Sequence, residues 1–293
     1  MLLGVVSYNF LEVEWFRLGL PIMLIIAFGI PHGATDHLAN NFTKTGKFST
    51  VVSRQFLIGY LSPIVLYTLV WLLAPQFSLV VFLAISAYHF GETQIMASLK
   101  SNSKFTCLHA SWGGFLLSIL FFLNPEETQL YLNEIIGFNK AQIIKRGAAM
   151  LCMIFSIGFI LSSFLLYKNR KINTKQIIHL LLDTFLLCSL LWFTDLLFGF
   201  AIFFACWHSY DAILLQITGF KEVKPNFNFK QFYFYAAPFT IISLLALSII
   251  FYLFINYEIP LNPVMLFFVF ISVITLPHML TIKQYYYRIQ PSS

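Results

Sequence analysis

Four short strings in this sequence place a histidine inside an apolar segment of membrane-spanning length. They read GIPHGATDH at 29–37, SAYHFGE at 86–92, WHSYD at 207–211 and LPHM at 276–279, and their histidines are His32, His89, His208 and His278. An ionisable group at bilayer depth costs at least ~2.5–3.5 kcal/mol on insertion scales, so each histidine is a functional candidate. Imidazole nitrogen binds Fe, Cu or Zn, and a site of mainly neutral nitrogen ligands keeps a divalent ion accessible to redox chemistry.

Three of the strings also carry a carboxylate at helical spacing from the histidine. The carboxylates follow the histidines by four, three and three residues, and they are Asp36, Glu92 and Asp211. Residues at this spacing share one face of a helix, and a metal-bound imidazole usually donates its second N–H to a carboxylate. We therefore expect these acids to orient the histidines, with direct ligation as the alternative. For His37, at the membrane interface, a structural or proton-relay role competes with ligation.

Membrane-spanning helices must position these groups. The 293 residues are 59% hydrophobic and 10% charged, whereas a soluble domain carries about 25% charged residues. Apolar runs of about 20 residues predict nine spans, or eight if a closely linked pair is miscounted. The spans lie near 17–38, 55–74, 77–97, 107–123, 147–167, 176–194, 196–218, 232–255 and 262–282. We therefore expect an all-α polytopic transmembrane helix bundle, residues 1–293 forming a single integral membrane domain, with a loop at 124–146.

The basic residues give the bundle an orientation. They gather in alternate loops, for example Lys168, Arg170 and Lys171 after the fifth span and Lys221 and Lys224 after the seventh. The positive-inside rule then puts the N-terminus outside and the C-terminus in the cytoplasm of a cell (inner) membrane. The same rule accounts for the net charge of +6, so we expect no nucleic-acid partner.

This orientation places the four candidate histidines at one depth. Each lies some four to ten residues before the cytoplasmic end of its span, which puts all four in the cytoplasmic half of the membrane. Imidazoles from four helices at similar depth are what a metal site inside a bundle requires. Glycines and prolines around His32 and before His278 predict broken or kinked helices there. The two histidines without such a context, His109 and His179, are expected at the interface.

Aromatic residues are abundant, with 34 Phe and 14 Tyr. They could line an apolar tunnel for a rigid polyene, although packing against lipid accounts for most of them. Tyr88 and Trp207, which directly adjoin candidate ligands, are the predicted pocket residues.

The strings PHGATDH, SAYHFGE, WHS and PHM resemble the Brp/Blh family of membrane β-carotene 15,15′-dioxygenases, and the resemblance runs from the first span to the last. It implies that O2 cleaves the central double bond of β-carotene, or a related carotenoid taken from the lipid phase, at a non-haem Fe(2+) to give two retinal molecules. It also implies that His32, His89 and His208 are iron ligands.

One position departs from the family pattern. Family members carry a second histidine four residues after the one in the seventh span, and here that residue is Ala212. Asp211 lies one residue earlier, and His278 or His37 could complete the set of ligands.

Other functional classes make different demands on the same residues. A haem-binding or electron-transfer membrane protein would use two of the histidines as axial ligands on facing helices. A rhodopsin is disfavoured because no lysine lies in the middle of a span to form a Schiff base. A transporter would place carboxylates at the membrane midplane, and a di-iron desaturase would need more histidines than the seven present.

Overall fold

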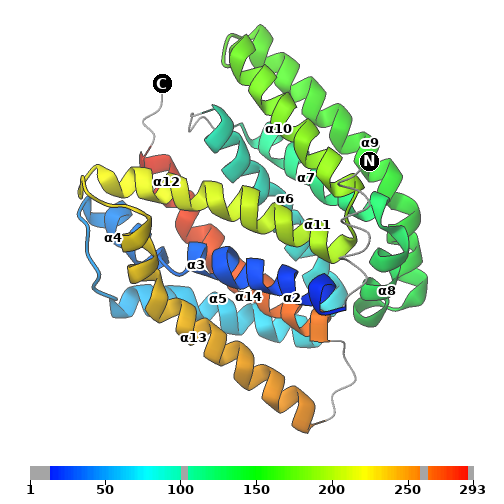
Figure 1. Cartoon of the computed structure of the whole chain (residues 1–293), viewed down its shortest axis with the longest axis horizontal. Coiled ribbons are helices and arrows are strands. Elements are labelled where there is room, and N and C mark those ends of the chain that lie inside the picture. The colour runs from blue at the N-terminus through cyan, green and yellow to red at the C-terminus, as the bar shows by residue number, and fades with distance from the viewer. Residues whose placement is uncertain (1–13, 100–104, 258–262, 290–293) are drawn as a thin grey trace.

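The computed structural model describes residues 14–99, 105–257 and 263–289, and the regular secondary structure in these ranges is helical (Figure 1). Among the described residues, nine helical runs are long and apolar enough to cross a membrane. They are Gly19–Thr45, Arg54–Leu73, Pro75–Leu99, Thr106–Leu123, Asn139–Lys168, Thr174–Trp192, Leu196–Lys221, Phe229–Asn256 and Pro263–Ile289. The predicted all-α bundle is confirmed, with nine spans and not eight.

Apolar side chains cover the outer helices α9 (Phe138–Lys168) and α13 (Phe229–Asn256), which lie on opposite sides of the bundle (Figure 1). The stripes are Ile157, Leu161 and Phe164 on α9 and Ile241, Leu245 and Ile249 on α13, all more than half exposed. A soluble monomer rarely exposes contiguous apolar surfaces of this kind to water. The protein is therefore a membrane protein whose outer helices face lipid.

The first span is broken into short pieces, as the glycines and the proline around His32 predict. The pieces are α2 (Glu14–Leu24), the π-helical turn η1 (Ile25–Gly29), α3 (Ile30–Gly33) and α4 (Asp36–Thr45). Pro31 lies in the first turn of α3, where its missing N–H costs least. Between α3 and α4 the backbone leaves the helical conformation at Thr35, with φ −99° and ψ 11°. The regular α-helix is thus interrupted on both sides of His32, by η1 before it and at Thr35 after it.

The seventh span contains a second π-helical turn. This span consists of α11 (Leu196–Ile202), the π-helical turn η2 (Phe203–Ser209) and α12 (Tyr210–Lys221). The two π-helical turns contact each other, and Gly29 makes this approach possible because a Cβ there would overlap the ring of Phe204. By contrast, α14 (Pro263–Ile289) runs unbroken through Pro277.

Two glycines bring α6 (Pro75–Leu99) and α7 (Thr106–Leu123) into backbone contact. A Cβ at Gly91 would collide with the carbonyl of His109, and a Cβ at Gly113 would collide with the carbonyl of Ala87. Small residues of this kind let membrane helices pack closely. The contact fixes α6, the helix that carries His89, at the centre of the bundle.

The remaining helices close the bundle around α6 and α14. α5 (Arg54–Leu73) packs against both, and α10 (Thr174–Trp192) packs against α6. α14 also packs against α4. The first and last parts of the described chain therefore lie side by side.

The prediction of a loop at 124–146 is wrong. Helix α8 (Pro125–Ile136) and the first turns of α9 occupy this segment. Pro125 begins α8, and the two glutamates of its first turn are favoured by the helix dipole. Gly137, with φ +81°, allows the chain to turn from α8 into α9.

Candidate metal centre

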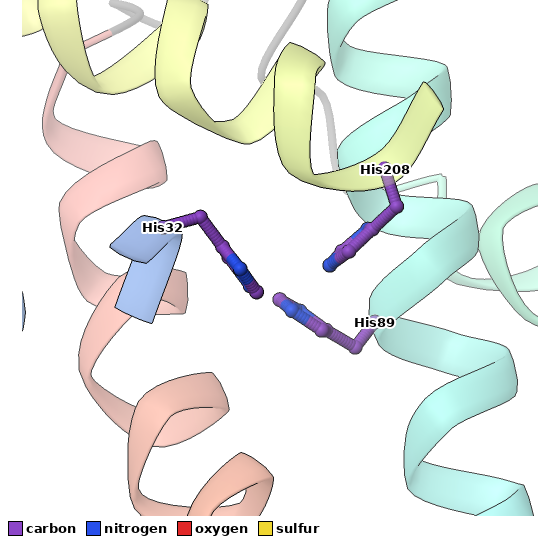
Figure 2. A group of neighbouring side chains, drawn as sticks. All are labelled: His32, His89 and His208. Carbon is purple, nitrogen blue, oxygen red and sulfur yellow. The ribbon is translucent and has the colours of Figure 1, made fainter. Parts of the chain in front are cut away.

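Three histidines converge at the centre of the bundle. His32 comes from α3, His89 from α6 and His208 from η2, and Figure 2 shows their rings directed toward one another. One ring nitrogen from each lies within 4.8 Å of the other two. All three side chains are at most 5% exposed. The spacing allows a single ion to contact all three imidazoles.

Two of these candidate ligands are each positioned by a π-helical turn. η1 ends three residues before His32, and η2 contains His208 itself. A π-helical turn adds a residue to a helix and changes the direction in which the following side chains point, and such turns are frequent at functional sites. His89, in contrast, lies on the uninterrupted helix α6.

His278 of α14 is a fourth imidazole beside the three. Its ring centroid lies 4.7 Å from that of His32 and 5.2 Å from that of His89. Its Nδ1 atom is hydrogen-bonded to the Asp36 carboxylate, at 2.9 Å and 3.0 Å from the two oxygens. Asp36 also accepts a hydrogen bond of 2.8 Å from the hydroxyl of Tyr60. His278 is therefore anchored on its Nδ1 side.

The remaining ring nitrogens suit a metal ion. Both nitrogens of His89, both of His208 and Nε2 of His278 are buried without a hydrogen-bond partner. A buried polar atom without a partner is unfavourable and needs an explanation. His32 uses Nδ1 for a hydrogen bond to the carbonyl of Gly29, which leaves Nε2 available. The imidazoles of His32, His89 and His208 fit a metal ion, and the ring of His278 lies beside them.

Comparisons with known proteins identify the family of this chain. The sequence model for the family described as beta-carotene 15,15′-dioxygenase matches residues 23–286, a range that contains all four histidines. The chain belongs to this family. The Beta-carotene 15,15′-dioxygenase of Uncultured marine bacterium 66A03 is 27% identical over 199 residues, which are 67% of each chain. No solved structure matches the chain. The chain is therefore a carotenoid-cleaving dioxygenase.

The carboxylates of the dioxygenase have other partners than the sequence predicts. Asp36 is bonded to His278 and not to His32. Glu92 accepts hydrogen bonds of 3.2 Å from the hydroxyls of Tyr88 and Tyr287. Since neither nitrogen of His89 has a partner, the expectation that Glu92 orients His89 is wrong.

Asp211 and His37 also lie apart from the histidine cluster. Asp211 lines a small polar hollow together with Asp183 and Trp207, and His208 has no hydrogen bond to it. The expectation that Asp211 orients His208 is therefore wrong. The ring of His37 packs on Phe239, with centroids 4.6 Å apart.

The two predicted pocket residues belong to polar surroundings instead. Tyr88 lies under the ammonium group of Lys283, 4.8 Å from its ring centroid. Trp207 donates a hydrogen bond of 3.2 Å to Asp183. Neither residue lines the apolar cavity of the dioxygenase, and their assignment to a substrate pocket stays a prediction.

The two histidines expected at the interface differ from each other. His109 is 1% exposed and lies in the first turn of α7, within the contact between α6 and α7. Its ring centroid lies 5.8 Å from that of Tyr88, outside the cluster. His179 is exposed and lines the polar hollow.

An apolar cavity extends from the α8 end of the bundle toward the metal centre. Along α6 it is lined by Leu79, Leu83, Ser86 and Phe90, which lie on successive turns and span about 16 Å at the helical rise. Ile25 of η1 and residues of α7, α8, α11 and α14 complete the lining. These residues could not be singled out from the sequence, because most of them are ordinary apolar residues within their own helices.

Aromatic rings lie between the cavity and the metal centre. The ring of Phe90, which lines the cavity, has its centroid 4.7 Å from that of His208. Phe204 stacks on His208 with centroids 5.5 Å apart, and its ring meets the His32 ring edge-on at 5.6 Å. The cavity and the histidine cluster of the dioxygenase are therefore adjacent, with apolar side chains at their junction.

Proposed function

We propose that this dioxygenase uses O2 to cleave the central 15,15′ double bond of β-carotene, giving two retinal molecules, at an Fe(2+) ion held by His32, His89, His208 and His278. The observation that carries the proposal is the convergence of His32, His89 and His208, since one ring nitrogen from each lies within 4.8 Å of the other two. The buried ring of His278 packs beside those of His32 and His89. Neutral nitrogen ligands suit a redox-active divalent ion. Bound iron supplies the O2 chemistry that amino-acid side chains lack.

His278 is the proposed fourth ligand and replaces the histidine that the family carries at position 212. Ala212 is fully buried and offers no ligand atom. The N–H at Nδ1 of His278 donates to Asp36, so the lone pair of Nε2 is available to the ion. Tyr60 donates to the same carboxylate and holds it toward His278. A carboxylate behind a ligand histidine fixes the tautomer and the ring orientation.

The proposed substrate is β-carotene or a related carotenoid that enters from the lipid phase. The cavity is lined almost entirely by apolar side chains, which suits a hydrocarbon polyene and disfavours a water-soluble substrate. It leads to the rings of Phe90 and Phe204 beside the histidines. These rings exclude water from the place where the double bond and O2 would meet.

The proposed location is a cell (inner) membrane, with the N-terminus outside and the C-terminus in the cytoplasm. The basic residues Lys168 and Lys171 lie at the link between α9 and α10, and Lys221 and Lys224 lie at the link between α12 and α13. Clusters of this kind favour the cytoplasmic side.

The experiment that tests the function is expression in a bacterium that makes β-carotene, followed by chromatography of the extracted pigments. The unmutated chain should turn carotene into retinal, and His89→Ala should leave the carotene intact. His109→Ala is the matched control, because it removes another buried imidazole on the neighbouring helix. Intact carotene despite verified membrane expression of the unmutated chain contradicts the proposed substrate. If longer apocarotenals are formed instead of retinal, the chain is an oxygenase that cleaves a different double bond.

The metal is tested on the purified protein. Iron near one ion per chain, lost in His89→Ala and kept in His109→Ala, is the expected result. A Soret band would instead favour haem bound by the same histidines. The geometry disfavours haem, because neighbouring imidazole centroids lie only 4.7 to 5.2 Å apart and leave no room for a macrocycle between them.

A further inference from the structure

The short helix that carries His32 depends on neighbouring elements for its position. α3 has four residues, with the π-helical turn η1 before it and a break at Thr35 after it. A helix this short has little stability of its own. A break also leaves backbone groups that need partners from elsewhere in the protein.

One side chain bonds to a residue just before this break and to Thr35 at the break itself. Nε2 of Gln216, on α12, donates to the backbone carbonyl of His32 at 2.8 Å. At the other end of the same amide, Oε1 accepts from the hydroxyl of Thr35 at 2.5 Å. Gln216 and Thr35 are both fully buried, so water does not compete for these bonds. The amide of Gln216 thus joins α3 to α12.

The position of Gln216 on its helix is equally informative. His208, Ala212 and Gln216 follow one another at intervals of four residues, so they share one face of the η2–α12 segment. The hydroxyl oxygen of Ser209 on the same segment lies 3.3 Å from Nδ1 of His32. The segment that supplies one candidate ligand therefore also holds another.

Gln216 itself is fixed from its far side. The hydroxyl of Tyr285 on α14 donates to the backbone carbonyl of Gln216 at 2.8 Å. Gly219 is required for this approach, since a Cβ there would overlap the Tyr285 hydroxyl. The helix α14, which carries His278, thus also braces the helix that carries Gln216.

We propose that Gln216, together with Thr35, is a positioning residue of the metal centre, which sets the place of His32 relative to His208. This inference rests on the proposed function, because it requires a metal ion at the histidines. Gln216 acts through the backbone of His32 and of Thr35. Its loss leaves the His32 carbonyl and the Thr35 hydroxyl buried without partners and frees α3 to shift. Outer partners of metal ligands typically change metal affinity by about 10–100-fold when they are removed.

The test measures binding of Co(2+) to the purified, metal-free full chain in detergent, through the intensity and position of its d–d absorption bands. Gln216→Met keeps the length of the side chain but removes both hydrogen bonds. We expect it to bind Co(2+) at least ~10-fold more weakly and with altered bands. Thr35→Val keeps the shape and removes only one bond, and its loss of affinity should be smaller.

The matched control is Gln176→Met. Gln176 also uses both ends of its amide, donating to the carbonyl of Leu99 at 2.6 Å and accepting from the backbone N–H of Asn173 at 2.9 Å. It joins α10 to the end of α6, away from the histidines. Gln176→Met should lower the thermal stability of the chain and leave the Co(2+) affinity and bands unchanged.

The outcomes separate this inference from the proposed function. If the unmutated chain binds neither Co(2+) nor Fe(2+), both the proposed metal site and this inference are wrong. If the unmutated chain binds Co(2+) and Gln216→Met binds it equally well with the same bands, only the inference falls. If Gln216→Met does not fold, Thr35→Val decides, because unchanged affinity and bands overturn the inference and a weakened, shifted site supports it.

Discussion

Nδ1 of His278 lies 2.9 Å from a carboxylate oxygen of Asp36, and this contact joins two residues that are 242 positions apart in the sequence. It connects α14, the last helix described, to α4 in the first span. Both side chains are buried. While Nδ1 of His278 is bonded to Asp36, the His278 ring also packs against the rings of His32 and His89. The fourth imidazole of the centre is thus placed by the first span.

Removing the carboxylate should weaken the metal centre. Asp36→Ala leaves His278 without its anchor, and we expect metal affinity to fall by about 10–100-fold. Titration of the metal-free chain with Co(2+) measures this change. Tyr60→Phe removes one hydrogen bond to Asp36 but leaves the bond to His278, so its effect should be smaller. Equal affinities for Asp36→Ala and the unmutated chain would show that His278 needs no anchor.

The departure at Ala212 offers a second test of His278. His278→Ala should lose most of the bound iron, because one of four imidazoles is removed. Ala212 lies one helical turn after His208 and is fully buried beside the centre. Adding Ala212→His to His278→Ala should restore part of the iron and of the retinal production, since it returns the family's histidine to the cluster. A double variant with no more iron than His278→Ala contradicts this exchange of ligands.

The cavity can be narrowed without touching the histidines. Leu83→Trp adds bulk to the cavity wall on α6, and we expect retinal production to fall at least ~10-fold while iron content stays unchanged, because the polyene can no longer fit. Val80→Trp is the matched control on the same helix, since Val80 is 63% exposed on the lipid-facing side. Pigment chromatography and metal analysis of the same membranes give both values. Normal production by Leu83→Trp would show that the carotenoid does not use this cavity.

Gly33 permits the close approach of His278 to α3. A Cβ at this position would lie 3.3 Å from Nδ1 of His278, closer than most real contacts. Gly33→Ala should displace the imidazole by a few tenths of an ångström and lower metal affinity several-fold. Gly147→Ala on α9, where a Cβ meets nothing within 4 Å, serves as the control. Unchanged affinity in Gly33→Ala would mean that the ring can shift without cost to the site.

Much of the fold and of the histidine cluster could be predicted from the sequence. Long apolar runs can satisfy their backbone groups in a membrane only as helices, so the nine spans follow from hydropathy. A histidine inside such a run is costly, which makes His32, His89 and His208 conspicuous. The charges in 124–146 suggested a loop, yet charged residues at the start of a helix are favourable, and α8 forms there.

The partners of the carboxylates could not be predicted, because a helix can break between two residues and because a residue on an intact helix has neighbours at spacings of both three and four. Asp36 is four residues after His32, but the break at Thr35 turns it away from that face and toward His278. Glu92 lies on an unbroken helix, where its neighbour at a spacing of four is Tyr88, and it is bonded to that residue. The roles of Gln216 and Phe90 depend on contacts between helices, and no local pattern encodes these.

The π-helical turns η1 and η2 imply that the position of the histidines depends on the number of residues that precede them in their helices. A π-helical turn is equivalent to one residue inserted into an α-helix. Each residue of a regular helix turns the chain by about 100°, so deleting one residue ahead of His208 would swing its imidazole out of the cluster. The same holds for His32 behind η1. The two π-helical turns therefore set the direction of two of the imidazoles of the centre.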